Sequence, residues 1–374
     1  MSPEIYKNAM KDLTQNNARN YGIDLLRMIS MLMVVILHVL DAGNVLDSTT
    51  AAMPAFHVAW AMEIACYCAV NSFALITGYV GITQKPKYAN LIQMTLQVLL
   101  YSVAFTVLIG ILYPGTVSPL DYVLAFIPFK HWYFTAYFCL FFFIPYINKI
   151  ILSLSQKQQI ILVTTASILF TVLPIVTRTD IADTQAGYSV IWLAYMYLLG
   201  AVLRLWNATE KIKKIPALLI YVGSVLIGVL SKECIEYITP MILGTARGGR
   251  LLIRYDSPVI VLAAVGLVLF FAQCNFKGFA QKVIAFFSPL AFGVYLIHEL
   301  PVLKEHFIRN KFAFVAAISP FLIPFAVLAI ALAIYLICTL IEIPRFYIFK
   351  WLKVKQGAQQ LCDLIDQKVL SKIQ

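Results

Sequence analysis

Long runs of apolar residues alternate with short polar segments along the whole chain. Each run is close to the length of a helix that crosses the hydrocarbon core of a bilayer, about 20 residues. These runs lack the strict apolar–polar alternation of a membrane β-barrel. The pattern predicts ten membrane-spanning helices, near residues 22–40, 55–81, 88–113, 132–148, 158–177, 188–203, 215–231, 257–274, 283–298 and 318–344.

Composition agrees with this pattern. Of the 374 residues, 61% are hydrophobic and only 13% are charged, and the mean hydropathy is +0.83. A soluble domain of this size does not need so much apolar surface. The seven cysteines show neither metal-ligand spacing nor a disulfide framework. We therefore expect an all-α fold, a polytopic membrane helix bundle without a metal site.

The basic residues set the expected orientation. The net charge of +11 is typical of a membrane protein that obeys the positive-inside rule, so we expect no nucleic-acid partner. With the N-terminus in the cytoplasm, the inner segments hold 19 Lys and Arg and the outer segments hold nine. Both termini are then cytoplasmic. The predicted parts are an N-terminal segment (1–21), a membrane domain (22–344) and an amphipathic tail on the inner surface (345–374).

The first predicted helix carries polar residues that lipid would not tolerate. Arg27 and His38 are eleven residues apart, about three helical turns, so they share one face and lie about 16 Å apart along the axis. Asp24 lies one turn before Arg27, within reach of an ion pair. Read singly, Arg27 could snorkel to the interface and His38 could be an interfacial histidine. Together the three residues favour a functional stripe that faces the bundle interior.

The second predicted helix carries a second polar stripe, because Glu63, Tyr67 and Asn71 recur every four residues. A carboxylate in mid-span needs a partner or a proton, so Glu63 is a candidate functional residue. Near the end of this helix, Gly78 permits either a close backbone approach or a local break.

Other polar and aromatic residues gather toward the predicted outer side. The aromatic residues at the start of the fourth helix are typical of an interface belt. The loop "GTARGGR" (residues 244–250) is either a flexible basic loop or a contact for an anionic glycan or a lipid diphosphate. The aromatic residues in question are Trp132, Tyr133 and Tyr137. All five histidines of the chain also fall in the outer half: His38, His57, His131, His298 and His306.

Several motifs resemble the integral-membrane acyltransferase-3 family, the bacterial enzymes that O-acetylate surface polysaccharides. The arginine, ten intervening residues and histidine of the first helix match Arg27 and His38. The segment "ALITGYV" resembles a Ser-Gly-Tyr-Phe motif of the family, although Thr77 stands for the serine and Val80 for the phenylalanine. The segment "FGVYLIHELP", which carries His298, resembles a C-terminal family segment.

The resemblance implies acetyl-CoA as the donor, with Arg27 holding a phosphate of CoA and His38 acting as the general base. A covalent acyl-histidine step is the alternative. It also implies further candidate residues: Asp24 and Thr77 in the donor site, and Glu63, His298 and Tyr79 in catalysis. Tyr79, Tyr133 or His298 could stabilise the oxyanion, and Glu63 could orient a histidine.

The expected acceptor is a surface polysaccharide or its lipid-linked precursor, and the expected location is the bacterial cell membrane, in contact with membrane lipid. The sequence leaves open whether the chain forms a homo-oligomer. The main rival is a transporter or flippase, whose polar stripes would line a transport pathway. An accessory membrane domain that serves uptake is a third reading. The chain shows no internal repeat, which disfavours the transporter.

Overall fold

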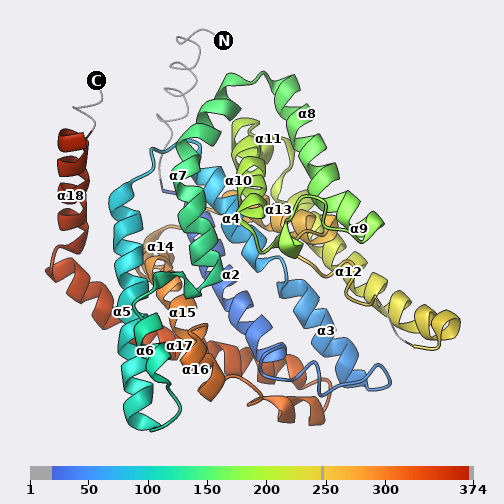
Figure 1. The fold of residues 1–374 in the computed structure, drawn as a ribbon. Helices are drawn as coiled ribbons and strands as arrows, with labels where there is room; N and C mark the ends of the chain where they lie inside the picture. The colour runs from blue at the N-terminus through green and yellow to red at the C-terminus, as the bar shows by residue number, and fades with distance from the viewer. Residues whose placement is uncertain (1–18, 246–247, 370–374) are drawn as a thin grey trace.

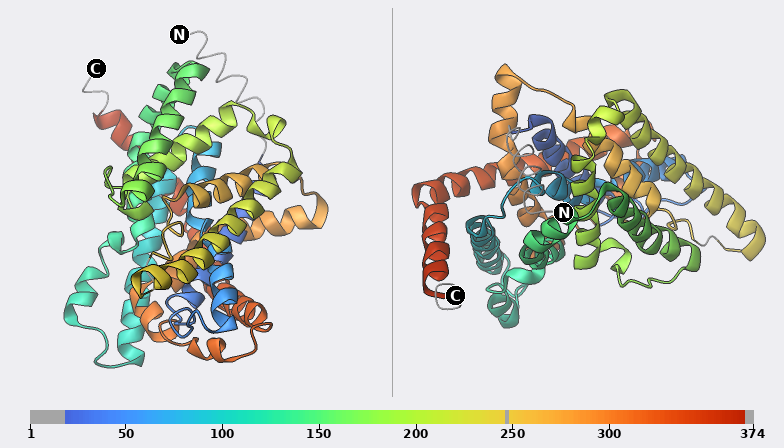
Figure 2. Two further views of the ribbon diagram at one scale, coloured as in Figure 1. Left: turned by 90° about the vertical axis from the view of Figure 1, so that its right-hand side faces the viewer. Right: turned by 90° about the horizontal axis from the view of Figure 1, so that it is seen from above.

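The computed structural model describes residues 19–245 and 248–369. This part of the chain is 77% helical and contains no strand, which confirms the all-α helix bundle. Figures 1 and 2 show helices packed side by side around α2, with α12 reaching outward on one side and α18 beside α5 on the other. Of the predicted N-terminal segment, residues 1–18 lie outside the described residues.

Eight segments are long and apolar enough to cross a membrane, and each coincides with a predicted window. Two further predicted windows form apolar helices of 16 and 15 residues, α10 (Val190–Leu205) and α13 (Pro258–Ala272), which are too short to span about 30 Å at 1.5 Å per residue. The predicted count of ten is therefore met by eight spans and two shorter helices. The eight are Tyr21–Leu40, Pro54–Gly81, Tyr88–Leu112, Trp132–Ser153, Gln156–Thr177, Lys214–Leu243, Gly278–His298 and Ile323–Trp351.

Helix α2 (Tyr21–Leu40) lies in the middle of the bundle (Figure 1). It begins at Asn20, whose side chain accepts a hydrogen bond from the backbone N–H of Ile23 at 3.0 Å and so caps the helix. Its neighbours are α3, α4, α13, α14, α15 and α17, which leave most of its surface buried. A helix surrounded in this way can carry polar side chains, because they face protein or a cavity instead of lipid.

The second predicted helix is two helices, α3 (Pro54–Cys66) and α4 (Ala69–Gly81), separated by a turn at Tyr67 and Cys68. The sequence left open a local break at Gly78, but α4 continues through this residue. Gly78 instead makes the close approach, because a Cβ at this position would collide with the backbone carbonyl of Tyr197 on α10. Tight packing of α4 against α10 thus requires glycine.

The ninth predicted span is also interrupted. Helix α14 (Gly278–Phe287) passes through a short 3₁₀ segment (Ser288–Leu290) into α15 (Ala291–His298). The interruption contains Pro289, which lacks the backbone N–H needed for a regular helix. The chain then turns at Glu299 into the short helix α16 (Pro301–Phe307). The end of α15 therefore places two consecutive residues with ionisable side chains, His298 and Glu299, beside the end of α2.

The C-terminal part differs from the predicted amphipathic tail in its boundary. Helix α17 (Ile323–Trp351) continues through Pro344, so Arg345 belongs to it and pairs with the buried Glu342. Lys353, at φ 52°, separates α17 from α18 (Val354–Val369). Residues 370–374 lie outside the described residues, and the orientation of the bundle in a membrane stays a prediction.

The other elements complete the bundle and its connections. Helix α18 packs against α5, and α10 packs against α4 and α7. The other 3₁₀ segments are Pro128–Lys130, Gln185–Gly187 and Ala313–Ala317, and a π segment covers Ile168–Val172. The remaining helices are α5 (Tyr88–Leu112), α6 (Pro119–Leu124), α7 (Trp132–Ser153), α8 (Gln156–Ser167), α9 (Leu173–Thr177), α11 (Ala208–Lys211) and α12 (Lys214–Leu243).

Candidate active site

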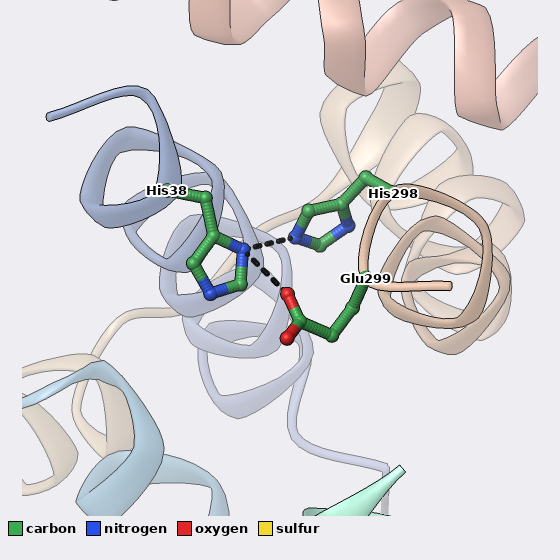
Figure 3. Close-up of side chains that lie close together, drawn as sticks. All are labelled: His38, His298 and Glu299. Carbon is green, nitrogen blue, oxygen red and sulfur yellow. Dashed lines mark hydrogen bonds and ion pairs between the residues drawn. The ribbon is translucent and has the colours of Figure 1, made fainter. Parts of the chain in front are cut away.

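Two histidines and a glutamate from distant parts of the chain meet at the end of α2. The Nδ1 atom of His38 lies 3.0 Å from Nε2 of His298 and 3.0 Å from a carboxylate oxygen of Glu299. Figure 3 shows both partners on one side of the His38 ring, with its second nitrogen on the other side. The predicted pair of His38 and His298 is thus brought together, and Glu299 joins it.

The hydrogen bonds fix which nitrogen carries each proton. Nδ1 of His298 lies 2.6 Å from the carbonyl oxygen of Val294, which can only accept, so this nitrogen carries a proton. In neutral His298, Nε2 then accepts from the Nδ1–H of His38, and the Glu299 carboxylate lies 3.0 Å from the same His38 nitrogen. Neutral His38 therefore keeps a free electron pair on Nε2. This is the arrangement that a general base requires.

Glu299 is an ionised carboxylate held on two sides. Its two oxygens accept hydrogen bonds from the Nζ atom of Lys304 at 2.8 and 3.0 Å. Burial alone would raise the pKa of Glu299, but its interactions with His38 and with the ammonium group of Lys304 lower it to about 2. The carboxylate can therefore stabilise a positive charge on His38. Sequence reasoning missed Glu299, although it directly follows His298 in the segment "FGVYLIHELP".

A single cavity of about 760 Å³ connects the two predicted ends of the polar stripe. Arg27 and His38 both line it, as their spacing on α2 predicts. Near Arg27 the cavity reaches the loop between α4 and α5, and near His38 it reaches the loops after α12 and α15. The end near Arg27 is lined by Gln84, Lys85, Lys87 and Asn90. The end near His38 is lined by Asp41, Arg250, Glu299 and Lys304.

Asp24 holds Arg27 in place. One oxygen of the buried Asp24 carboxylate accepts from Arg27 at 2.5 Å, and the other accepts from Arg19 at 2.5 Å. This confirms the predicted ion pair between Asp24 and Arg27. Asp24 itself does not line the cavity, so its geometry fits a positioning residue for Arg27 better than a direct donor contact.

Glu63 lies in the cavity wall on α3, but it does not contact the histidines. The side chain is only 5% exposed, and one carboxylate oxygen has no hydrogen-bond partner within the described residues. The carboxylate that contacts His38 is Glu299, so the prediction that Glu63 orients a histidine is wrong. Glu63 instead lines the cavity and keeps one buried carboxylate oxygen without a partner within the described residues.

The two residues predicted from the "ALITGYV" segment separate in the structure. Thr77 lines the cavity, and its hydroxyl donates to the carbonyl oxygen of Phe73 at 2.9 Å. Tyr79 is buried outside the cavity lining, and the guanidinium of Arg204 lies 5.3 Å from its ring centre. Helical geometry explains this, because residues two apart project from nearly opposite faces. The structure does not bring Tyr79 to the site.

The aromatic residues at the start of α7 also differ from expectation. Trp132, Tyr133 and Tyr137 line the cavity, so they do not form the predicted interface belt. Of the other histidines, His131 is buried, and its burial lowers its pKa to about 4. His57 pairs with Glu233 at the surface. The loop predicted at residues 244–250 is described only in part, because residues 246 and 247 lie outside the described residues, but Arg250 lines the cavity.

The ligand atoms of His38, His298 and Glu299 lie within 4.8 Å of one another, close enough to hold one metal ion. Two of the three separations, both 3.0 Å and both at the same His38 nitrogen, are a hydrogen bond to His298 and an ion-pair contact with Glu299. The expectation of a site without metal stays a prediction.

The comparison with known families identifies the family of the chain. A family model described as an acyltransferase domain matches residues 20–342, which include Arg27, His38 and the cluster at His298. The searches of curated proteins and of solved structures gave no match. The chain belongs to the acyltransferase-3 family, and it is a multi-pass membrane acyltransferase.

Proposed function

We propose that the protein moves an acetyl group from cytoplasmic acetyl-CoA to a hydroxyl of a cell-surface polysaccharide or of its lipid-linked precursor, in the bacterial cell membrane. The observation that carries the proposal is the single cavity that has a guanidinium at one end and a histidine with a free Nε2 at the other. The donor would enter from the side of Arg27. The acceptor would enter from the side of Asp41 and Arg250.

The Arg27 end suits the anionic part of CoA. Phosphates bind best to guanidinium groups that are held in place, and Asp24 holds Arg27. Lys85 and Lys87 line the same end of the cavity and add positive charge. From Arg27 to His38, α2 rises about 16 Å, a length comparable to the flexible arm between the phosphates and the thioester.

The His38 end suits activation of an alcohol. A hydroxyl is a poor nucleophile at neutral pH, so a base must remove its proton as it attacks the thioester. Nε2 of His38 would take this proton, and Glu299 would stabilise the imidazolium that forms. Direct attack by His38 on the thioester, which would give an acyl-histidine, uses the same nitrogen and remains the alternative.

The outer part of the cavity suits a sugar. Tyr67, Trp132, Tyr188 and Tyr255 line it and contact one another, with ring centres 4.6 Å apart for Trp132–Tyr188 and 4.9 Å for Tyr67–Tyr255. Such rings can pack against the C–H face of a sugar. The unpaired carboxylate of Glu63 could accept hydrogen bonds from its hydroxyls.

The test is a transfer assay with purified full-length protein, radiolabelled acetyl-CoA and candidate surface glycans. We expect label on a glycan with the parent protein, and no transfer with His38→Ala. Arg27→Ala should weaken CoA binding more than it slows the chemical step, because its guanidinium is far from the reacting atoms. Lys157→Ala, a change in the exposed first turn of α8, is the control and should behave like the parent.

Two outcomes would contradict the proposal. Transfer by His38→Ala at the parental rate would remove the proposed base. Flux of a glycan across a vesicle membrane without cleavage of any thioester would favour the transporter. Equal CoA affinity in Arg27→Ala and the parent would contradict the proposed donor site alone.

A further inference from the structure

The hydroxyl of Tyr295 is a buried donor without a partner in the wall of the cavity. Tyr295 lies on α15, one turn before His298, and the centres of the two rings are 6.5 Å apart. Its side chain is 7% exposed, and its hydroxyl makes no hydrogen bond within the described residues. A phenol buried without a partner costs free energy. Other atoms of Tyr295 line the cavity, so this buried hydroxyl lies next to the space that a substrate would occupy.

The N-terminus of α7 lies beside this hydroxyl. The ring of Tyr295 is 5.4 Å from the ring of His131, the residue that precedes α7, and 6.3 Å from the ring of Tyr133. The first three residues of α7, Trp132 to Phe134, line the cavity, and no side chain caps the helix. The N–H groups of these residues lack an acceptor within the helix, and the helix dipole makes this end positive. Such an end favours negative charge.

Both features belong to the same end of the cavity as His38. The ring centres of His38 and His298 are 5.1 Å apart, and the ring of His298 lies between those of His38 and Tyr295. The negative charge of Glu299 is already balanced by Lys304 and by the hydrogen bond from His38. This carboxylate therefore does not occupy the Tyr295 hydroxyl or the first turn of α7, and these donors match a developing negative charge.

We propose that the Tyr295 hydroxyl and the N-terminus of α7 bind the oxyanion of the acyl-transfer step, which makes Tyr295 a catalytic residue. This inference rests on the proposed function. As Nε2 of His38 takes the proton of the acceptor hydroxyl, the hydroxyl oxygen bonds to the thioester carbon and the C=O pair moves onto the carbonyl oxygen. Tyr295 donates a hydrogen bond to that oxygen. When the pair returns, the C–S bond breaks, and the sulfur takes the proton from His38. An ester and a free thiol result.

The other candidates for this role fit less well. Both ring nitrogens of His298 already have partners, Val294 and His38. Tyr79 does not line the cavity. The indole N–H of Trp60 is a second unpaired donor in the cavity wall, but it lies near Lys232 and Arg250, whose charged groups are 3.8 and 4.8 Å from the Trp60 ring centre. Trp60 thus belongs to the outer opening.

The experiment compares Tyr295→Phe with Tyr335→Phe in full-length protein. Tyr335, on α17, also has a buried hydroxyl without a partner within the described residues, but it does not line the cavity, so it is a matched control. The assay is release of free thiol from acetyl-CoA with water as the acceptor, which needs no identified glycan. Tyr295→Phe should lower kcat about 10²-fold and leave KM for acetyl-CoA within about threefold. Tyr335→Phe should stay within about twofold of the parent in both constants.

A kcat of Tyr295→Phe within about twofold of the parent, with His38→Ala inactive, would overturn the inference and leave the proposed function standing. A parent that releases no thiol, or a His38→Ala variant that releases it at the parental rate, would contradict the proposed function and this inference with it. These patterns distinguish the two failures.

A second pair of variants tests the helix and avoids any change at Tyr295. Trp132→Pro and Trp132→Ala both lose the indole, and only proline also removes the backbone N–H. Proline is tolerated at the first position of a helix, so α7 should persist. The proline variant should release thiol at least about tenfold more slowly than the alanine variant. Equal rates of thiol release by the two variants would contradict the proposed role of the α7 N-terminus in binding the oxyanion.

Discussion

At the scale of single residues, the site depends on what surrounds the Nδ1 atom of His38. Two acceptors, His298 and Glu299, lie 3.0 Å from it, and they leave the opposite nitrogen free toward substrate. The place of His38 in the site was predictable from its spacing to Arg27 on one helix. Glu299 was not, because its approach to His38 depends on where α15 ends, and the sequence does not set a helix end to within one residue.

Glu299→Gln keeps the shape of this side chain and removes its charge. We expect kcat to fall by about 10²-fold, because the imidazolium of His38 would lose its negative partner. Thiol release from acetyl-CoA measures the effect. Glu305→Gln, which removes a carboxylate from an exposed ion pair with Arg309, is the control and should leave kcat unchanged. An unchanged kcat in Glu299→Gln would contradict the role of this carboxylate.

Stability should fall as the pH drops from 6.5 to about 4. Burial lowers the pKa of His131 in the folded protein to about 4, whereas a histidine in an unfolded chain titrates near 6.5. Above pH 6.5 both states are neutral at this residue, so it has no effect. Below pH 6.5 the unfolded chain binds a proton that the folded chain does not, and the loss reaches about 3 kcal/mol near pH 4.

Thermal denaturation in detergent at pH 7 and pH 5 measures this loss. His131→Gln cannot bind the proton, so its midpoint should change less between the two pH values than that of the parent. Glu299, whose lowered pKa also stabilises the fold, adds a loss only below about pH 4.5, outside this interval. Equal shifts in the variant and the parent would show that His131 is not responsible.

At the scale of elements, the apolar windows were predictable and the interruptions were not. Every predicted window holds an apolar helix, because the length of an apolar run follows directly from bilayer thickness. The breaks at Tyr67–Cys68 and at Ser288–Leu290 lie inside apolar runs, and tertiary packing decides where such runs bend. These breaks matter, since Tyr67 and Ser288 both line the cavity.

Glycine at position 78 should be needed for the packing of α4 against α10. Gly78→Ala places a methyl group against the carbonyl of Tyr197, so we expect a loss of about 1–3 kcal/mol. Gly223→Ala on α12 is the matched control, because nothing lies within 4 Å of the added carbon. That variant should be neutral or more stable, by up to about 1 kcal/mol. Thermal midpoints in detergent compare the two, and equal midpoints would contradict the close approach.

At the scale of the whole molecule, the orientation follows from the distribution of Lys and Arg. Lys85 lies in the loop between α4 and α5, on the predicted inner side, and Thr116 lies in the loop after α5, on the predicted outer side. In a chain without its native cysteines, Thr116→Cys should react with a membrane-impermeant maleimide added to intact cells. Lys85→Cys should react only after the membrane is opened. The reverse pattern would invert the bundle and move the donor side outward.

The central claim is that donor and acceptor meet inside one cavity, with the two ends of CoA at the two polar residues of α2. The most direct measurement is a structure of the full-length protein with bound CoA. We predict its phosphates beside the guanidinium of Arg27 and its sulfur within reach of Nε2 of His38. CoA bound outside this cavity, or with its sulfur directed away from His38, would contradict the account.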